Sequence, residues 1–357
     1  MKKFYLLLLL SISAIGFSQA PANYYNNATG TGYTLKTQLK TIISSGHVTK
    51  SYAALYTCYQ TSDRDYFYEN DGTILDIYSE NPAGTDPYIY SATITGDRCG
   101  SYSVEGDCFN REHLMPQSVF SERTPMVSDA HHILPTDGKV NGMRSNYPFG
   151  KVNSPTWTSR NGSKLGNNST PGYSGRAFEP IDEFKGDVAR AILYFGTRYQ
   201  DQIASWNHAM LDGTSNHVFS NWFLDLLLTW HNQDPVSPRE ITRNNAIYAF
   251  QGNRNPYIDH PEFVTSIWGM PLSTETFDAL ASISVYPNPS NDHKINIETE
   301  QVLNEIQLIN VNGQLMQNIK NPNSQNNTYT LENLPSGFYF LKLTSENHST
   351  TKKVIIN

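Results

Sequence analysis

Apolar residues recur at helical spacing in the middle of the chain. Val188, Ala191, Ile192, Phe195 and Tyr199 follow an i, i+3, i+4, i+7, i+11 pattern, which predicts an amphipathic helix. Similar patterns predict further helices: two short ones within 33–59, a largely apolar and therefore buried one at 216–231, one at 237–251, and a shorter one that ends at Gly269. The helix at 237–251 also carries a start signal, because Ser237, Pro238 and Glu240 stand in the order of a capping box with proline at the first position.

Two other patterns flank these helices. Residues 63–176 are rich in Gly, Asn, Ser and Tyr, and we interpret "TILDIYS" and "DPYIYSATI" as strands among long, ordered loops of the kind that usually carries function. After a change of composition at 274–282 the chain reads as short strands separated by turn residues, and Asn312-Gly313 between two alternating runs predicts a hairpin. Residues 274–357 are therefore expected to form a small all-β sandwich. This part holds no His–carboxylate cluster, so we assign it no chemistry.

The N-terminus has the pattern of a secretory signal peptide at 1–20. Two lysines precede an apolar run that is too short for a stable membrane span, and small residues at Ser18 and Ala20 offer cleavage sites. No later stretch is apolar enough for a transmembrane helix. We expect an exported monomer without stable membrane insertion. Export permits disulfides; Cys99 and Cys108 could close a short loop, although the three cysteines of the chain leave three single pairings open.

Charge is distributed unevenly. The net charge of −7 argues against a polyanionic substrate, yet one segment, 139–176, has no Asp or Glu. Its basic residues are Lys139, Arg144, Lys151, Arg160, Lys164 and Arg176. The segment is either a solvated loop face or a surface that contacts phosphates.

Residues with the chemistry of phosphodiester hydrolysis gather near Glu112 and His113. They are followed by His131, His132, Asn141, Arg144 and Asn146. Carboxylate and carboxamide oxygens suit Mg²⁺ or Ca²⁺, an imidazole can take a proton from water, and guanidinium groups hold phosphates. Neighbours on a regular strand point to opposite faces, so we place Glu112 and His113 at a strand end, where the chain bends before Pro116. Taken alone, each of these residues also has an ordinary structural interpretation.

A resemblance favours the chemical interpretation. "NREHLMPQSVF", "SDAHHILPTDGKVNGMRSNYPFG" and "QGNRNPYIDHPEF" resemble, in order, three signature blocks of the endonuclease I family of secreted and periplasmic nucleases. The resemblance covers roughly residues 33–270. It implies an α+β fold at 21–273, in which a ββα-metal (His-Me finger) nuclease core is flanked by several helices.

The resemblance also implies residue roles. His113 matches the general base of the family, and Glu112 and Asn141 match its metal ligands. Arg144 matches a catalytic arginine position, with phosphate contact as its expected role. His131-His132 stands where the family often has a His-Asn pair, which leaves the role of the second residue open. The implied cofactor is Mg²⁺, with Mn²⁺ or Ca²⁺ as alternatives.

The expected protein is therefore a secreted, divalent-metal-dependent nonspecific nuclease that acts on DNA, RNA or both and leaves 5′-phosphate ends. Two alternatives stay open: a phosphodiesterase for small esters, and an adhesin or glycan-binding protein without catalysis. The C-terminal part, "SVYPNPSND…GFYFLKL…KKVIIN", is similar to the sorting domain of the type IX secretion system. This resemblance implies the secretion machinery as a partner and an extracellular or cell-surface location reached through the periplasm; a carbohydrate- or surface-binding module is the alternative.

Overall fold

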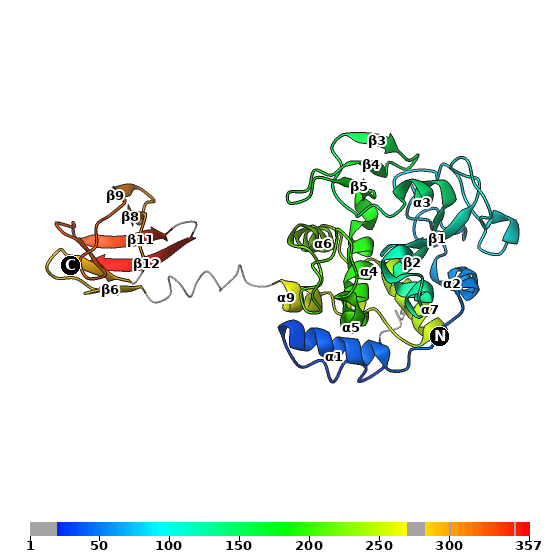
Figure 1. Ribbon diagram of the computed structural model, residues 1–357, viewed down its shortest axis with the longest axis horizontal. Helices are drawn as coiled ribbons and strands as arrows, with labels where there is room; N and C mark the ends of the chain where they lie inside the picture. The colour runs from blue at the N-terminus through cyan, green and yellow to red at the C-terminus, as the bar shows by residue number, and fades with distance from the viewer. Residues whose placement is uncertain (1–19, 270–282, 300, 346–347) are drawn as a thin grey trace, which may run out of the picture. The chain divides into compact units, whose positions relative to one another are not determined.

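The structure, a computed structural model, describes residues 20–269, 283–299, 301–345 and 348–357 (Figure 1). The chain divides into two units, Met1–Gly269 and Met270–Asn357. The predicted signal peptide lies, apart from Ala20, outside the described residues. No helix in the described part is long and apolar enough to cross a membrane.

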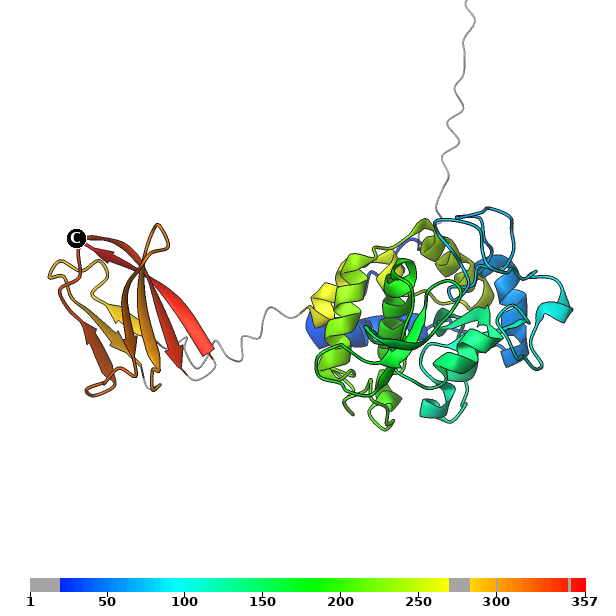
Figure 2. The same cartoon turned by 90° about the horizontal axis from the view of Figure 1, so that it is seen from above.

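The first unit combines helices with two small sheets. Its α-helices are α1 (Gly32–Ser44), α2 (Leu55–Ser62), α3 (Gly138–Arg144), α4 (Lys185–Arg198), α5 (Gln200–Ile203), α6 (Asn221–Gln233), α7 (Pro238–Gln251), α8 (Pro256–Asp259) and α9 (Glu262–Trp268). Its short 3₁₀ turns are η1 (Tyr52–Ala54), η2 (Thr95–Asp97), η3 (Gln117–Phe120), η4 (Met126–Ser128), η5 (Ala130–His132) and η6 (Asp182–Phe184). The predicted helices are confirmed as α1, α2, α4, α6, α7 and α9. The blue α1 and the yellow α9 pack side by side (Figures 1 and 2).

The predicted start of α7 is confirmed in detail. The Ser237 side chain accepts a hydrogen bond from the Glu240 amide, and the Glu240 carboxylate accepts one from the Ser237 amide, so the capping box is complete. Two of the amide groups that a helix start leaves without partners are thereby satisfied.

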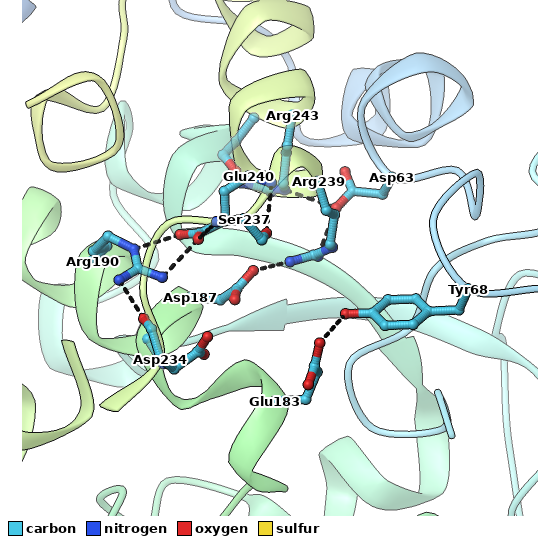
Figure 3. A network of polar contacts seen from close by, with 12 residues as sticks. Asp63, Tyr68, Glu183, Asp187, Arg190, Asp234, Ser237, Arg239, Glu240 and Arg243 are labelled. Carbon is cyan, nitrogen blue, oxygen red and sulfur yellow. Dashed lines mark hydrogen bonds and ion pairs between the residues drawn. The ribbon is translucent and has the colours of Figure 1, made fainter. Parts of the chain in front are cut away.

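The polar side of α4 is not exposed to solvent, as that of an amphipathic surface helix would be. Every residue from Lys185 to Thr197 is buried, because α1, α6 and α8 pack around this helix. Its polar residues are accommodated by ion pairs, as Figure 3 shows. Arg190 forms a double ion pair with Glu240 (Nε–Oε1 and Nη2–Oε2, both 2.6 Å), and Asp187 pairs with Arg239. Buried charges of this kind are tolerated only when they are paired.

The two strands predicted at 73–79 and 86–94 are wrong. Both segments are loops, apart from an isolated bridge between Arg64 and Ile74. The buried side chain of Asp76 explains the first case. Its carboxylate accepts the backbone amides of Tyr78 (2.8 Å) and Asp137 (2.7 Å), which replaces the hydrogen bonds of a strand ladder.

The sheets of the first unit are small and antiparallel. β1 (Phe109–His113) pairs with β2 (Ile133–Asp137), with Glu112 opposite Leu134, and α3 follows β2 directly. The order along the chain is thus strand, strand, helix. β3 (Pro155–Thr158), β4 (Lys164–Asn167) and β5 (Arg176–Glu179) form the second sheet. A bridge from Phe149 to Phe178 ties the segment after α3 to β5, so this sheet lies next to α3 (Figure 1).

Two of the three cysteines form a disulfide and the third is free. Cys99 and Cys108 form a disulfide, one of the pairings that the sequence left open, and Cys58 is buried and free. Because the bridge joins the loop before β1 to the residue that precedes this strand, it restrains the approach to β1.

The second unit consists of strands in the described residues. They are β6 (Ser284–Tyr286), β7 (Ile295–Glu298), β8 (Glu305–Asn310), β9 (Leu315–Lys320), β10 (Thr328–Leu331), β11 (Gly337–Ser345) and β12 (His348–Ile356). One sheet has the order β10-β7-β6 and the other β12-β11-β8-β9. Ile297, Leu341 and Val354 belong to one hydrophobic cluster that both sheets share. The hairpin predicted at Asn312-Gly313 is confirmed between β8 and β9, with Gly313 at a φ of 80°.

Candidate functional site

A polar pocket lies between the end of β1 and α3. Its volume is about 300 Å³, and its lining includes all four residues predicted to carry the chemistry, Glu112, His113, Asn141 and Arg144. The remaining lining residues are Tyr52, Tyr56, Cys99, Gly100, Tyr102, Asn110, Arg111, Pro116, Gln117, Ser145 and Asn146. His113 is the last residue of β1. The pocket therefore reaches both faces around the strand end, and two sequence neighbours can line it together.

Glu112 is a buried carboxylate held by one of its two oxygens. Its Oε1 accepts the Tyr78 hydroxyl at 2.8 Å and lies 3.0 Å from Nη1 of Arg144. Within the described residues, Oε2 accepts no hydrogen bond. Burial raises the pKa of Glu112 above its ordinary value, although Arg144 and Tyr78 act in the opposite direction. One oxygen thus remains available to an added ligand.

His113 is buried and neutral. Burial lowers its pKa to about 3, and the His132 ring adds to this effect. Its Nε2 lies 3.2 Å from the Val127 carbonyl oxygen. Because a carbonyl oxygen only accepts, Nε2 carries the proton and Nδ1 keeps its lone pair. The contact with Val127 therefore fixes the tautomer in which Nδ1 can accept a proton.

Asn141 comes from the first turns of α3. Its Nδ2 donates to the Asn110 side-chain oxygen at 2.6 Å, which leaves Asn141 Oδ1 as a free acceptor. Asn110 and Glu112 are two residues apart on β1 and so lie on one face of the strand. The pocket thus brings a carboxylate oxygen and a carboxamide oxygen together.

Arg144, at the end of α3, has contacts with the protein rather than an open guanidinium group. It is 1% exposed; Nη1 donates to the His113 carbonyl at 2.7 Å and Nη2 to the Leu114 carbonyl at 2.6 Å. Together with the ion pair to Glu112, these contacts fasten α3 to the end of β1. The expected phosphate contact stays a prediction, and the observed contacts favour a positioning role.

The other predicted polar residues divide between pocket and core. Asn146 lines the pocket. His131 and His132 do not line it: they are buried, and their Nε2 atoms lie 3.0 and 2.8 Å from the carbonyl oxygens of Asn253 and Met126. His132 still touches the site, since its ring lies 5.7 Å from that of His113.

Sequence reasoning missed several residues that line the pocket, and also Tyr78, a partner of Glu112 outside this lining. Tyr78 lies 34 residues before Glu112, and no spacing rule connects them. Asn110 and Arg111 could have been found, because they belong to the quoted block "CFNREHLMPQSVF" and share the strand with Glu112. The Arg111 guanidinium stacks on Tyr52, with Cζ 3.5 Å from the ring centroid, and this places a cation at the pocket wall.

The acid-free segment 139–176 extends from α3 to the first residue of β5. Lys151, Arg160 and Arg176 are exposed, Lys139 and Lys164 half-buried, and Arg144 is buried. The segment therefore offers accessible cations, while only its first part, on and just after α3, lines the pocket.

Two family models match the chain. The model of endonuclease I matches residues 31–262, more than half of the chain and the region that contains the pocket. The model of a secretion system C-terminal sorting domain matches residues 284–357.

Individual proteins are similar over much of the same region. The extracellular ribonuclease of Bacillus subtilis (strain 168) is 33% identical over 266 residues, which are 73% of this chain and 83% of that protein. The extracellular ribonuclease of Bacillus amyloliquefaciens is 34% identical over 250 residues, 69% of this chain and 78% of that protein. A periplasmic deoxyribonuclease of Aeromonas hydrophila is 28% identical over 150 residues, 39% of this chain and 50% of that protein.

Proposed function

The chain belongs to the endonuclease I family, and from this premise we propose that the pocket at Glu112 and His113 is the reaction centre of a divalent-metal-dependent nuclease. The family makes the protein a nuclease with a secretion sorting domain at its C-terminal end. The proposal adds the residue roles, the metal, the polymers cleaved and the 5′-phosphate products. One observation carries it: residues from β1 and α3 with the complete chemistry of phosphodiester hydrolysis line a single pocket.

Glu112 and Asn141 are the proposed metal ligands. Glu112 Oε2 and Asn141 Oδ1 have no hydrogen-bond partner among the described residues, whereas the second polar atom of each side chain is engaged. A carboxylate and a carboxamide oxygen form a hard donor set that fits Mg²⁺, and equally Mn²⁺ or Ca²⁺. When bound, the cation would supply positive charge next to the phosphate and the departing oxygen.

His113 is the proposed general base. The Val127 carbonyl holds the proton on Nε2, so Nδ1 can take the proton of a water molecule that attacks phosphorus. Burial keeps the imidazole neutral over the whole physiological range, so the base is present in its active form. The low pKa makes the free imidazole a weak base, and the negative charge of a bound phosphate beside it would raise its basicity.

Arg144 and the exposed cations have separate proposed roles. Arg144 positions Glu112 and the end of β1 through its three contacts. Arg111 at the pocket wall and the accessible lysines and arginines of 139–176 are the proposed contacts to backbone phosphates. Such contacts carry no base information, which supports cleavage without sequence preference.

Both DNA and RNA are proposed substrates. The similar proteins include extracellular ribonucleases and a periplasmic deoxyribonuclease, and the lining of the pocket combines polar groups for a phosphate with tyrosines, on which any base can stack. The C-terminal sorting domain implies contact with the secretion machinery, and the enzyme is secreted. We propose that this domain takes no part in catalysis; the monomeric state stays a prediction.

The test is a cleavage assay with metal removal and return. Plasmid DNA and RNA are incubated with the purified enzyme in EDTA and then with Mg²⁺, Mn²⁺ or Ca²⁺ in excess. We expect no cleavage in EDTA, recovery with at least one ion, and 5′-phosphate ends. Undiminished cleavage in EDTA would remove the metal from the scheme. A chromogenic diester in the same buffers separates a nuclease from a phosphodiesterase for small esters, which would prefer the diester to either polymer.

A further inference from the structure

Three carboxylates in the loop region before β1 form a cluster that the nuclease site does not use. The side-chain oxygens of Asp65, Glu69 and Glu80 lie within 4.8 Å of one another. None of the three lines the pocket at Glu112. Two oxygens that share a Ca²⁺ ion at about 2.4 Å each can be at most about 4.8 Å apart, so the separation suits a shared cation.

Glu80 is the unusual member of this cluster. It is 0% exposed, and neither carboxylate oxygen has a hydrogen-bond partner in the part of the chain that the structure describes. Other buried carboxylates of the described residues are satisfied: Glu112 pairs with Arg144, Glu240 with Arg190, and Asp63 with Arg243. A buried carboxylate without any partner costs several kcal/mol, as an order of magnitude, unless it is protonated or binds a cation.

Only one of the two carboxylate oxygens of Asp65 accepts hydrogen bonds within the described part of the chain. Its Oδ1 accepts the amides of Phe67 and Tyr68, each at 3.0 Å, whereas Oδ2 accepts no hydrogen bond from the described residues. Backbone hydrogen bonds from Asp65 to Thr73 (2.9 Å) and from Gly72 to Asp65 (2.8 Å) close the loop around it. The loop therefore holds Asp65 in place with one oxygen free.

The charge around the cluster is negative. Burial raises the pKa of Glu80 to about 9, and Asp86, Glu69 and Asp65 add to this effect through repulsion. Within the described residues no lysine, arginine or histidine forms an ion pair with Asp65, Glu69 or Glu80. Arg239, whose charge lowers the pKa of Glu80, pairs with Asp187 instead (Figure 3). Positive charge has to come from elsewhere if Glu80 is ionised.

We propose that Asp65, Glu69 and Glu80 bind a divalent cation, with Ca²⁺ as the ion that fits best, at a site separate from the catalytic pocket. Ca²⁺ accepts irregular sets of carboxylate, carbonyl and water oxygens, as a loop provides, whereas Mg²⁺ demands a near-octahedral set. The cation replaces mutual repulsion by attraction and fixes the segment 65–80. This segment carries Tyr78, which donates to Glu112, so the cation fixes the position of a hydrogen-bond partner of the proposed metal ligand.

The test is thermal unfolding of the full chain, first in EDTA and then with Ca²⁺ titrated to about 10 mM, because carboxylate sites of extracellular proteins bind with Kd of about 10⁻⁴–10⁻³ M. Because the catalytic pocket is also proposed to accept Ca²⁺, we expect the Tm of the wild type to rise by several degrees more than that of Glu80→Gln. Glu112→Gln, which disables the proposed catalytic ligand, should keep the rise.

The variants also report on folding. Glu80→Gln should be at least as stable as the wild type in EDTA, because the change removes an ionisable group without partners. Glu69→Gln alters an exposed side chain and should raise the Ca²⁺ concentration needed for half the effect roughly fivefold or more. If the Tm of the wild type does not change with Ca²⁺, the cluster binds no Ca²⁺ and Glu80 is buried as a neutral acid. A rise lost in Glu112→Gln and kept in Glu80→Gln would place the ion in the catalytic pocket alone. Either result overturns the proposal and leaves the nuclease assignment intact.

Discussion

Replacement of Arg144 by alanine separates a positioning role from a phosphate contact. The guanidinium is 1% exposed, donates to the carbonyls of His113 (2.7 Å) and Leu114 (2.6 Å), and lies 3.0 Å from the Glu112 carboxylate. The substitution leaves two buried carbonyl groups without donors and a buried carboxylate without its cation. Loss of one partner of a buried ion pair costs about 3–5 kcal/mol, and each unsatisfied carbonyl adds about 1–3 kcal/mol before the structure relaxes.

We therefore expect Arg144→Ala to lower the free energy of unfolding by at least about 3 kcal/mol in urea denaturation. Activity should fall by roughly 100-fold or more in kcat, because the end of β1 and the Glu112 carboxylate lose their alignment. Saturating Mg²⁺ should restore part of the stability, since a cation on Glu112 replaces part of the lost charge. Arg144→Lys should recover only a fraction, because one ammonium group cannot span all three oxygens.

Arg176→Ala is the matched control. Arg176 is exposed and its guanidinium donates to the Thr156 hydroxyl, so its loss should change stability by no more than about 0.5 kcal/mol. A different outcome for Arg144→Ala would refute the positioning role. If stability changes by less than about 1 kcal/mol while KM rises and kcat is kept, Arg144 contacts the phosphate of the substrate instead.

Two further predictions concern the stability of the first unit. Glu240→Gln deprives the fully buried Arg190 of its carboxylate (Figure 3), and urea denaturation should show a loss of about 3–5 kcal/mol that the exposed Glu262→Gln does not share; equal midpoints would contradict this. Burial lowers the pKa of His131 and of His132 to about 4 from an ordinary 6.5. The unfolded chain therefore binds more protons between these values, and stability should fall as the pH drops from 6.5 to 4, by about 2–3 kcal/mol per ring at pH 4.5. A urea midpoint that is the same at pH 7 and pH 4.5 would be incompatible with neutral buried rings.

Helices with local signals were predictable from the sequence. Ser237, Pro238 and Glu240 specify the start of α7 by contacts within one turn, and Asn312-Gly313 specifies the β8–β9 hairpin in the same local way. The loop at 73–79 was not predictable, because its conformation depends on Asp76, whose carboxylate binds an amide 61 residues away at Asp137. A short apolar run indicated a strand there, but the contact of Asp76 with the distant Asp137 amide produces a loop instead.

In the candidate site, too, residues within short sequence blocks were predictable and their distant partners were not. Glu112, His113, Asn141 and Arg144 could be named from the sequence, because short blocks around β1 and α3 contain them, and the structure brings all four to one pocket. Their partners could not be named, since Tyr78 and Val127 reach the site from other parts of the chain. The cluster at Glu80 gave no sequence signal either, because its carboxylates have irregular spacing and meet only when the loop closes.

The central claim is that His113 activates water in a metal-dependent nuclease site. The most direct measurement compares the initial rates of plasmid and RNA cleavage at saturating Mg²⁺ for the wild type, His113→Gln and His217→Ala. Glutamine can keep a donor toward the Val127 carbonyl but cannot take the proton, and His217 is a half-buried histidine outside the pocket. The account predicts a folded His113→Gln variant that is slower by about 10²–10⁴-fold and a His217→Ala variant with wild-type rates. Cleavage by folded His113→Gln at rates near those of the wild type would contradict it.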